Sequence, residues 1–150
     1  MEPKHLFKIS VVIHVPPSHV WKVMSEVEKW PVWTPSVRKI RRLDKGEFAV
    51  GSRAVVYQPK LPPALWRVTE LNAERDFTWV SSVPGVHIIA HHSIEPVPEG
   101  SIVMLSVQYK GLLAPVLSRL TAGITSQYLE FEAGGLKNEC ERTYPAWRPA

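Results

Sequence analysis

Three histidines stand close together in the stretch VHIIAHHSIE at residues 86–95, and an imidazole can bind a metal ion or transfer a proton. The alternating, β-branched pattern of this stretch predicts a strand. On one face of that strand His87 and His91 would lie about 13 Å apart, while His92 would point to the opposite face. We therefore predict no metal site and no cofactor, because the ligands of a zinc ion must converge on one point.

Proton transfer is the chemistry left for one of these histidines and for a tyrosine on the next strand. Parity places His92 with Ile88, Ala90 and Ile94 on an interior face, and it favours an interior Tyr109. His92 could move protons, and Tyr109 could donate to a ligand oxygen, so both are candidate catalytic residues. Each also has a purely structural interpretation, as a satisfied core histidine and as a tyrosine whose hydroxyl meets solvent. The sequence leaves both interpretations open.

The elements that must position these side chains follow from hydrophobic periodicity. A strand is predicted at residues 7–15 and a short helix at 18–27, which Ser18 would cap. Six strand-like runs follow at residues 37–43, 52–58, 65–71, 77–82, 86–95 and 102–110. Their short connectors are rich in turn formers, which predicts an antiparallel meander. From residue 112 the period becomes helical, with Pro115 in the first turn, and we expect one helix of roughly 28 residues.

Composition and charge narrow the class of protein. The chain has 150 residues, 45% hydrophobic and 21% charged, which are values typical of one globular domain. No apolar run is long enough for stable membrane insertion and no signal peptide is apparent, so we expect a cytoplasmic protein. The net charge is +4, but the basic run RKIRR divides between two strand faces, which argues against nucleic-acid binding. Cys140 is the single cysteine and cannot form an internal disulfide.

Four segments carry a resemblance to a known family. They are VWKVMSEVEKWPVWTPSV after the first strand, PPALWRVTELNAERDFTW across two middle strands, IEPVPEGSIV before the last strand and EAGGLKNECE late in the helix. With the order of elements, the chain resembles the START-like, or SRPBCC (Bet v 1-like), superfamily, and within it the polyketide cyclase/dehydrase-type branch. The similarity runs from about residue 7 to residue 141.

The order of elements predicts an α+β fold, and the resemblance implies that it is a helix-grip fold. In that fold a seven-stranded antiparallel curved sheet wraps around a long C-terminal helix, with one or two short helices after the first strand. A deep, largely apolar cavity lies between sheet and helix. We expect a single START-like ligand-binding domain over residues 1–150, with a core at about 7–142 and a tail at 143–150, as a monomer or homodimer.

Strand parity and helix spacing predict which residues line such a cavity. The expected ligand-binding residues are Trp33, Trp66, Val68, Phe77, Trp79, Ile88, Ala90, His92, Tyr109, Leu117, Leu120 and Ile124. The prolines in KWPVWTP, residues 29–35, predict a rigid loop in place of a continued helix. There Trp30, Pro31 and Trp33 could wall the mouth of the cavity, or the two tryptophans could simply fill the core between loop and sheet.

Three functions remain open at this point. The first is a binding or carrier protein for a small hydrophobic or aromatic molecule, a lipid included. The second is an enzyme of the polyketide cyclase, aromatase or dehydrase type that uses His92 or Tyr109 in the cavity. The third is a protein-interaction module. No nucleophile elbow, phosphate-binding glycine loop or HExxH motif is present to favour the enzyme.

Overall fold

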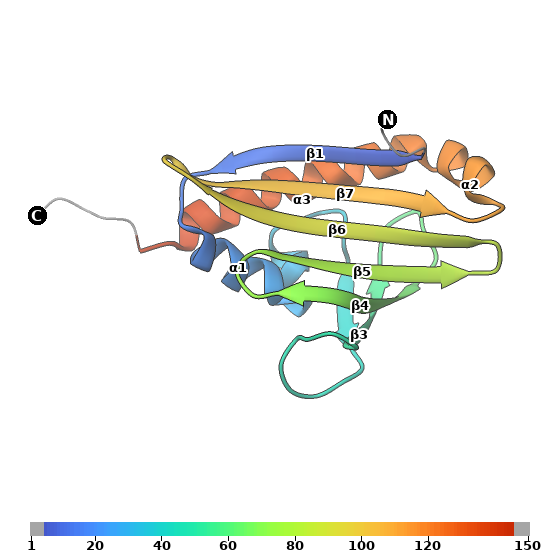
Figure 1. Cartoon of the computed structure of the whole chain (residues 1–150), viewed down its shortest axis with the longest axis horizontal. Helices are drawn as coiled ribbons and strands as arrows, with labels where there is room; N and C mark the ends of the chain where they lie inside the picture. Colours follow the sequence, from blue (N-terminus) through green and yellow to red (C-terminus); the bar gives the residue numbers. More distant parts are fainter. Residues whose placement is uncertain (1–4, 146–150) are drawn as a thin grey trace, which may run out of the picture.

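The computed structural model describes residues 5–145, and it shows a curved antiparallel sheet with the helices gathered on one side (Figure 1). The strand order is β1-β7-β6-β5-β4-β3-β2. The strands are β1 (Leu6–Ile13), β2 (Lys39–Arg42), β3 (Arg53–Tyr57), β4 (Ala64–Asn72), β5 (Asp76–Val83), β6 (Val86–Val97) and β7 (Gly100–Lys110). The helices are α1 (Pro17–Ser25), the 3-10 helix η1 (Val27–Val32), α2 (Ala114–Leu120) and α3 (Ala122–Thr143). The predicted helix-grip fold and meander are confirmed.

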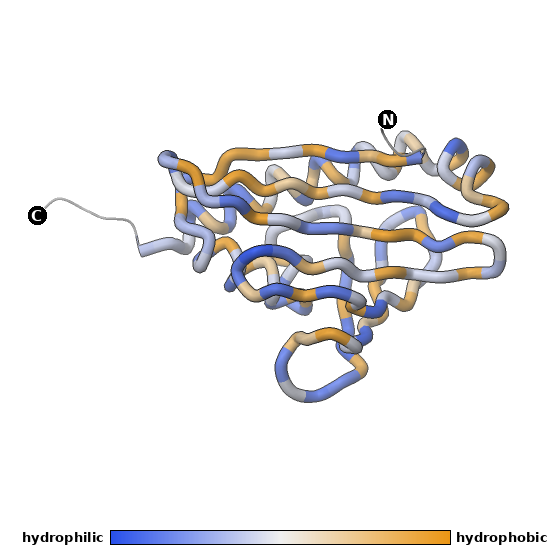
Figure 2. Tube along the Cα trace, viewed as in Figure 1, coloured by the Kyte–Doolittle hydropathy of each residue, from blue (hydrophilic) through white to orange (hydrophobic). Residues whose placement is uncertain are grey.

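Side chains alternate between the two faces of the sheet as the sequence predicts. On β6, His92 and Ile94 are buried, and on β7, Val103 and Leu105 are buried. Orange and blue segments accordingly alternate along the strands in Figure 2. Because a strand has a side-chain period of two, one buried face fixes the register of each strand against its neighbour.

The segment between β1 and β2 differs from its prediction in two ways. Pro16 occupies the N-cap of α1 and no side chain caps the helix, so the predicted capping role of Ser18 is wrong. The helix ends at Ser25, but the segment with Pro31 then forms the 3-10 helix η1 and not an irregular loop. A 3-10 turn is short enough to accept a proline that would interrupt a longer α-helix.

The predicted single C-terminal helix is two helices. Thr121 separates α2 from α3, with φ −106° and ψ 8°. Its N–H and its hydroxyl both donate to the carbonyl oxygen of Leu117, at 3.0 and 2.8 Å. These bonds satisfy the end of α2 locally, so the chain can restart in a new direction. Within residues 5–145, no helix is long and apolar enough to cross a membrane.

Helix α3 lies across the concave side of the sheet and packs closely at its C-terminal half. Its buried stripe is Leu129, Ala133, Leu136 and Cys140. Gly135 provides the close approach expected of a helical glycine, but toward the backbone of Trp33 and not toward the sheet. A Cβ at position 135 would come within 3.0 Å of the Trp33 carbonyl group. Small residues therefore let this half of α3 sit tightly against η1 and the sheet.

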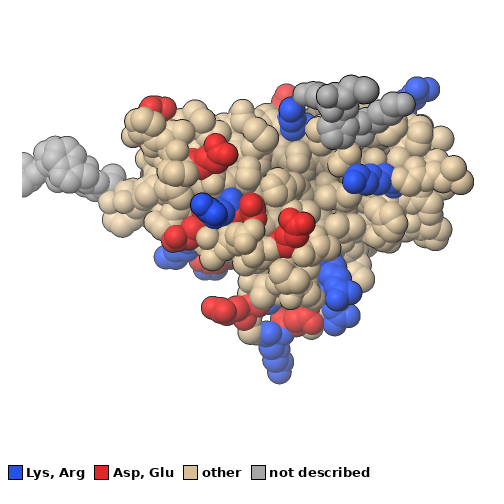
Figure 3. All heavy atoms as spheres, viewed as in Figure 1, with Lys and Arg blue, Asp and Glu red and all other residues tan. Residues whose placement is uncertain are grey.

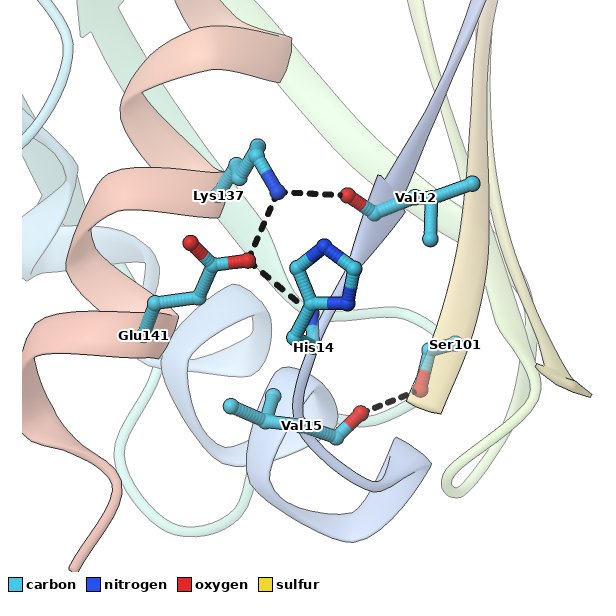
Figure 4. A network of polar contacts seen from close by, with 6 residues as sticks. All are labelled: Val12, His14, Val15, Ser101, Lys137 and Glu141. Atoms are coloured by element: carbon cyan, nitrogen blue, oxygen red, sulfur yellow. Dashed lines mark hydrogen bonds and ion pairs between the residues drawn. The ribbon is translucent and has the colours of Figure 1, made fainter. Parts of the chain in front are cut away.

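Polar contacts fasten the same end of α3 to strand β1 (Figure 4). The Lys137 ammonium donates to the Val12 carbonyl oxygen at 2.9 Å and to the Glu141 carboxylate at 2.7 Å. The backbone N–H of His14 donates to the same carboxylate at 2.9 Å. Burial alone would raise the pKa of Glu141, but the bonds from Lys137 and His14 outweigh it, and the pKa lies below its usual value.

Candidate ligand-binding site

A cavity of about 370 Å³, here called the inner cavity, lies between the sheet and the N-terminal half of α3. Strands β4 to β7 form one wall, and residues of α2 and α3 form the other. The loop between β3 and β4 closes one side, because the Tyr128 hydroxyl on α3 donates to the Pro59 carbonyl oxygen across it. The side chains that line it include Trp30, Val56, Leu61, Trp66, Trp79, Val83, Ile88, Ala90, His92, Val107, Tyr109, Leu117, Ile124, Tyr128, Leu129 and Glu132.

Three tryptophans form a continuous aromatic wall in this cavity. Trp79 on β5 lies between the other two, with ring centroids 5.6 Å from Trp66 and 5.5 Å from Trp30. The Trp30 indole N–H donates to the Met24 carbonyl oxygen at 2.9 Å, which fixes that ring. The Trp66 indole nitrogen is buried without a hydrogen-bond partner among the described residues. Such a donor carries an unrecovered desolvation cost that an acceptor on a bound molecule could relieve.

His92 and Glu132 face each other in the cavity, with Nε2 and Oε1 3.3 Å apart; the histidine is buried and the glutamate partly buried. The imidazole stacks on Phe77 with centroids 4.1 Å apart and an interplanar angle of 8°. Its Nδ1 lies 3.3 Å from the Phe77 carbonyl oxygen, which can only accept, so Nδ1 carries a proton in that bond. Nε2 and the facing carboxylate oxygen can share a proton at this point of the cavity wall.

A second polar cluster lies where α2 meets α3. The Tyr109 hydroxyl is 3.0 Å from Thr121 Oγ1 and 2.9 Å from Thr125 Oγ1. Thr121 already donates its hydrogen to the Leu117 carbonyl, so it accepts from Tyr109. Thr125 must then donate to the tyrosine oxygen. The hydrogen of the Tyr109 hydroxyl is thus committed within the protein and helps to hold the break between the two helices.

The two predicted catalytic residues, His92 and Tyr109, do not lie in contact with each other. In the β6–β7 ladder Tyr109 pairs with Ile88, whereas His92 pairs with Leu105. That offset along the strands corresponds to about 13 Å, which excludes a direct proton transfer between them. His92 has Glu132 as its partner instead. Tyr109 and His92 mark two separate polar positions in one apolar cavity.

Eight of the predicted ligand-binding residues line the inner cavity. They are Trp66, Trp79, Ile88, Ala90, His92, Tyr109, Leu117 and Ile124. Four others lie outside the lining. Val68 and Phe77 are fully enclosed in the core, where Phe77 contacts Trp21 and Phe48, and Leu120 is 76% exposed because the break at Thr121 turns that end of α2 outward.

Trp33 is the fourth residue outside the lining, and of its two interpretations the structure fits core filling and not the cavity mouth. The ring is buried against Trp30, with centroids 5.5 Å apart, and the residue packs under Gly135 of α3. Trp30 is the tryptophan of this turn that reaches the cavity. Sequence reasoning also missed Glu132, although a carboxylate one position from the buried stripe of Leu129 and Ala133 was a signal that could have found it.

The other two histidines of β6 face the outside of the sheet. His87 bonds Ser82 Oγ at 2.6 Å, and His91 bonds Thr78 Oγ1 at 2.6 Å. Burial lowers the pKa of His91, and the nearby His92 lowers it further. Across the described residues no group of three or more histidine, cysteine, aspartate or glutamate side chains could hold a metal ion.

A larger hollow of about 520 Å³, the outer groove, lies between α1, η1 and the loop that joins β2 to β3. Its walls include the charged residues Glu26, Glu28, Lys29, Arg42 and Glu47. Arg42 donates to the carbonyl oxygens of Gly46 and Glu47 at 2.8 and 3.2 Å, so its guanidinium stabilises the loop between β2 and β3. The inner cavity is the more apolar of the two and lies between sheet and helix, which makes it the candidate ligand site.

Comparisons with known proteins show which family and which solved structures this chain resembles. A family profile described as polyketide cyclase / dehydrase and lipid transport matches residues 4–141. No curated protein matches the chain. Similar solved structures include the hypothetical protein jhp0584 of Helicobacter pylori, with a TM-score of 0.77 and 11% identity over 90% of this chain and 87% of that one.

Two further structures carry more informative names. The Zhui aromatase/cyclase of Streptomyces sp. R1128 has a TM-score of 0.76 and 14% identity, over 94% of this chain and 96% of that one. A START superfamily protein of Mycobacterium smegmatis has a TM-score of 0.70 and 14% identity, over 89% and 97% of the two chains. Identities this low show the shared fold alone. The predicted START-like resemblance is confirmed, and the chain belongs to the polyketide cyclase / dehydrase and lipid transport family.

Proposed function

We propose that this protein binds one small hydrophobic or aromatic molecule in the inner cavity. The observation that carries the proposal is the cavity itself, whose volume of about 370 Å³ lies within the usual range for ligand pockets. Tryptophan and aliphatic side chains supply apolar contact, and the polar groups are few. The family description and the START-like fold support the same class of function.

The arrangement of polar groups suggests what such a molecule looks like. A planar ring system would lie against Trp66 and Trp79, since indole faces favour stacked or tilted aromatic contacts. An oxygen on that molecule could accept from the unpartnered Trp66 N–H. A second polar group would lie near His92 and Glu132. The expected ligand is therefore mostly apolar and oxygenated at one or two positions.

A cavity-filling substitution tests the proposal. The neutral dye N-phenylnaphthylamine should bind the wild type near one to one and quench tryptophan emission. Ile124→Trp should abolish that binding, because the larger ring fills the cavity. Phe131→Trp is the matched control, since Phe131 lies on the same helix, is partly exposed and does not line the cavity. Equal dye affinity in both variants and the wild type would show that the dye, and the proposed site, lie elsewhere.

The His92–Glu132 pair favours a second candidate function, an enzyme of the cyclase, aromatase or dehydrase type. A buried histidine that can share a proton with a facing carboxylate can pass a proton to or from a bound carbonyl compound. We would follow deuterium exchange into an aryl methyl ketone by NMR. An enzyme should accelerate exchange, and His92→Gln should abolish the acceleration while dye affinity stays the same. A wild type no faster than buffer would leave only the binding function.

Three finer expectations stand as predictions beside this proposal. They are a single domain over residues 1–150, a cytoplasmic location, and a monomeric or homodimeric state. Light scattering of the purified protein measures the last directly.

A further inference from the structure

Apolar side chains protrude from the end of the molecule that carries α2 and the β5–β6 hairpin (Figure 1). We call this surface the α2 face, and it consists of Val83, Leu112, Leu113, Val116 and Leu120. Leu112 is 90% exposed, Leu120 76% and Val116 59%. Most large apolar side chains on a protein surface stand singly, so a group on one short helix and the adjoining hairpin requires an explanation.

The α2 face adjoins the cavity lining. Leu117 lines the cavity, while its neighbours Val116 and Leu120 point outward. Val83 both lines the cavity and is 52% exposed. The Leu113 N–H donates to the Gly85 carbonyl oxygen at 2.9 Å, which fixes the start of α2 on the β5–β6 hairpin. The face is therefore a rigid rim and not a loose loop.

Among residues 5–145, the stretches of chain that form this rim carry charges of one sign. Three stretches of the chain supply the sheet side of the cavity, the β5–β6 hairpin, α2 and the start of α3. These stretches are residues 48–69, 77–94 and 103–129, and they contain no aspartate or glutamate. Lys60, Lys110 and Arg119 are exposed within them. On the side drawn in Figure 3, the right-hand end, where α2 lies in Figure 1, carries blue spheres and no red ones.

We propose that the α2 face docks on the surface of an anionic phospholipid membrane. Aliphatic side chains on a short helix enter the headgroup region, and flanking lysine and arginine are attracted by anionic lipid. A second copy fits poorly, because a twofold contact would bring Lys110 and Arg119 of both copies together with no carboxylate from the described residues of this face between them. A protein partner fits less well than lipid, since protein interfaces favour aromatic anchors and this face has none.

Docking of this kind differs from ligand binding and can be tested without a cavity ligand. Sedimentation with vesicles of phosphatidylcholine alone, and with about 30% phosphatidylglycerol, measures it. We expect binding only to the anionic vesicles, weakened by salt because the attraction is screened. The double variant Leu112→Ser/Leu120→Ser should bind about tenfold more weakly through lost apolar contact, and Lys110→Gln/Arg119→Gln should lose most of the preference for anionic lipid.

Matched controls lie on the loop between β2 and β3, away from the α2 face. Val50 is 62% exposed, so Val50→Ser removes a comparable apolar side chain, and Lys45→Gln removes a comparable charge. Both should bind vesicles like the wild type. The proposal is overturned if the wild type does not bind anionic vesicles, or if the controls lose as much binding as the α2 variants. It is also overturned if the α2 substitutions instead dissociate a dimer into monomers. Unchanged dye binding and circular dichroism in each variant separate this result from failure of the cavity or of folding.

Discussion

Substitution by alanine should change the stability of the protein in opposite directions at the adjacent Gly134 and Gly135 of α3. Alanine is about 1 kcal/mol better than glycine in a helix interior. A Cβ at Gly134 would meet nothing within 4 Å, so Gly134→Ala should stabilise the protein by about that amount. At Gly135 the new methyl group would meet the backbone of Trp33, and that contact should outweigh the gain.

The cost at Gly135 follows from what the methyl group would touch. It would lie 2.9 Å from the Trp33 carbonyl carbon and 3.2 Å from ring atom Cε3, with the carbonyl oxygen closer still. Ordinary contact begins at 3.4 Å, so the carbon alone requires a retreat of about 0.5 Å. Backbone cannot rotate away as a side chain can. Overpacking of this kind costs about 1–3 kcal/mol, and the close carbonyl oxygen places Gly135→Ala in the upper part of that range, at about 2–3 kcal/mol. After the helix-propensity gain of about 1 kcal/mol is subtracted, we expect a net loss of about 1–2 kcal/mol.

Thermal and urea denaturation, followed by circular dichroism, measure the difference between the two variants. A gap of about 2–3 kcal/mol corresponds to about 5–10 °C in Tm for a chain of this size. The m-value should stay constant, because neither change alters the surface exposed on unfolding. If Gly135→Ala were as stable as Gly134→Ala, α3 would not approach Trp33 as described, and the tight half of the helix would need another explanation.

Two further predictions concern the same end of α3. The pKa of Glu141 is lowered, so its charge stabilises the fold above the unfolded pKa, and that contribution is lost as pH falls through the folded pKa. Urea denaturation of Glu141→Gln should therefore show a loss of about 1 kcal/mol or less at pH 7, since the pair is partly exposed, and none at strongly acidic pH. Burial raises the pKa of the Cys140 thiol to about 12, so a disulfide reagent at pH 8 should label it only in urea, and rapid native labelling would contradict its burial.

The sequence predicts the sheet well because strand burial is a local, repeating signal. Alternation alone assigns Trp66 and Trp79 to the inside and Arg67 to the outside, and a register error would reverse all three. The break at Thr121 was not predictable in the same way. Threonine and the nearby Gly123 are only weak helix breakers, and the bonds at that break include one with the Tyr109 hydroxyl of β7, which helix periodicity does not show.

Only part of the candidate site could be predicted from the sequence. Its strand residues follow from parity, but the His92–Glu132 pair joins a strand and a helix far apart in the sequence. A glutamate in a helix ordinarily indicates the solvated face, so the position of Glu132 beside the buried Ala133 was only a weak signal, and the packing identifies it as a cavity residue. Trp33 was misplaced for a related reason, because its burial depends on the missing side chain of Gly135.

The inner cavity exists because the two halves of α3 pack differently against the same sheet. Ala133 and Gly135 allow close contact toward the C-terminal end, and Lys137 and Glu141 fasten that end to β1. Toward the other end Ile124 and Tyr128 line the inner cavity, and the Tyr128 hydroxyl donates to the Pro59 carbonyl oxygen of the loop between β3 and β4. Local opening takes place where buried apolar contacts are sparse. We therefore expect local opening to begin along the part of α3 that lines the inner cavity, while α2 stays bonded to the β5–β6 hairpin and the fastened end keeps the fold intact.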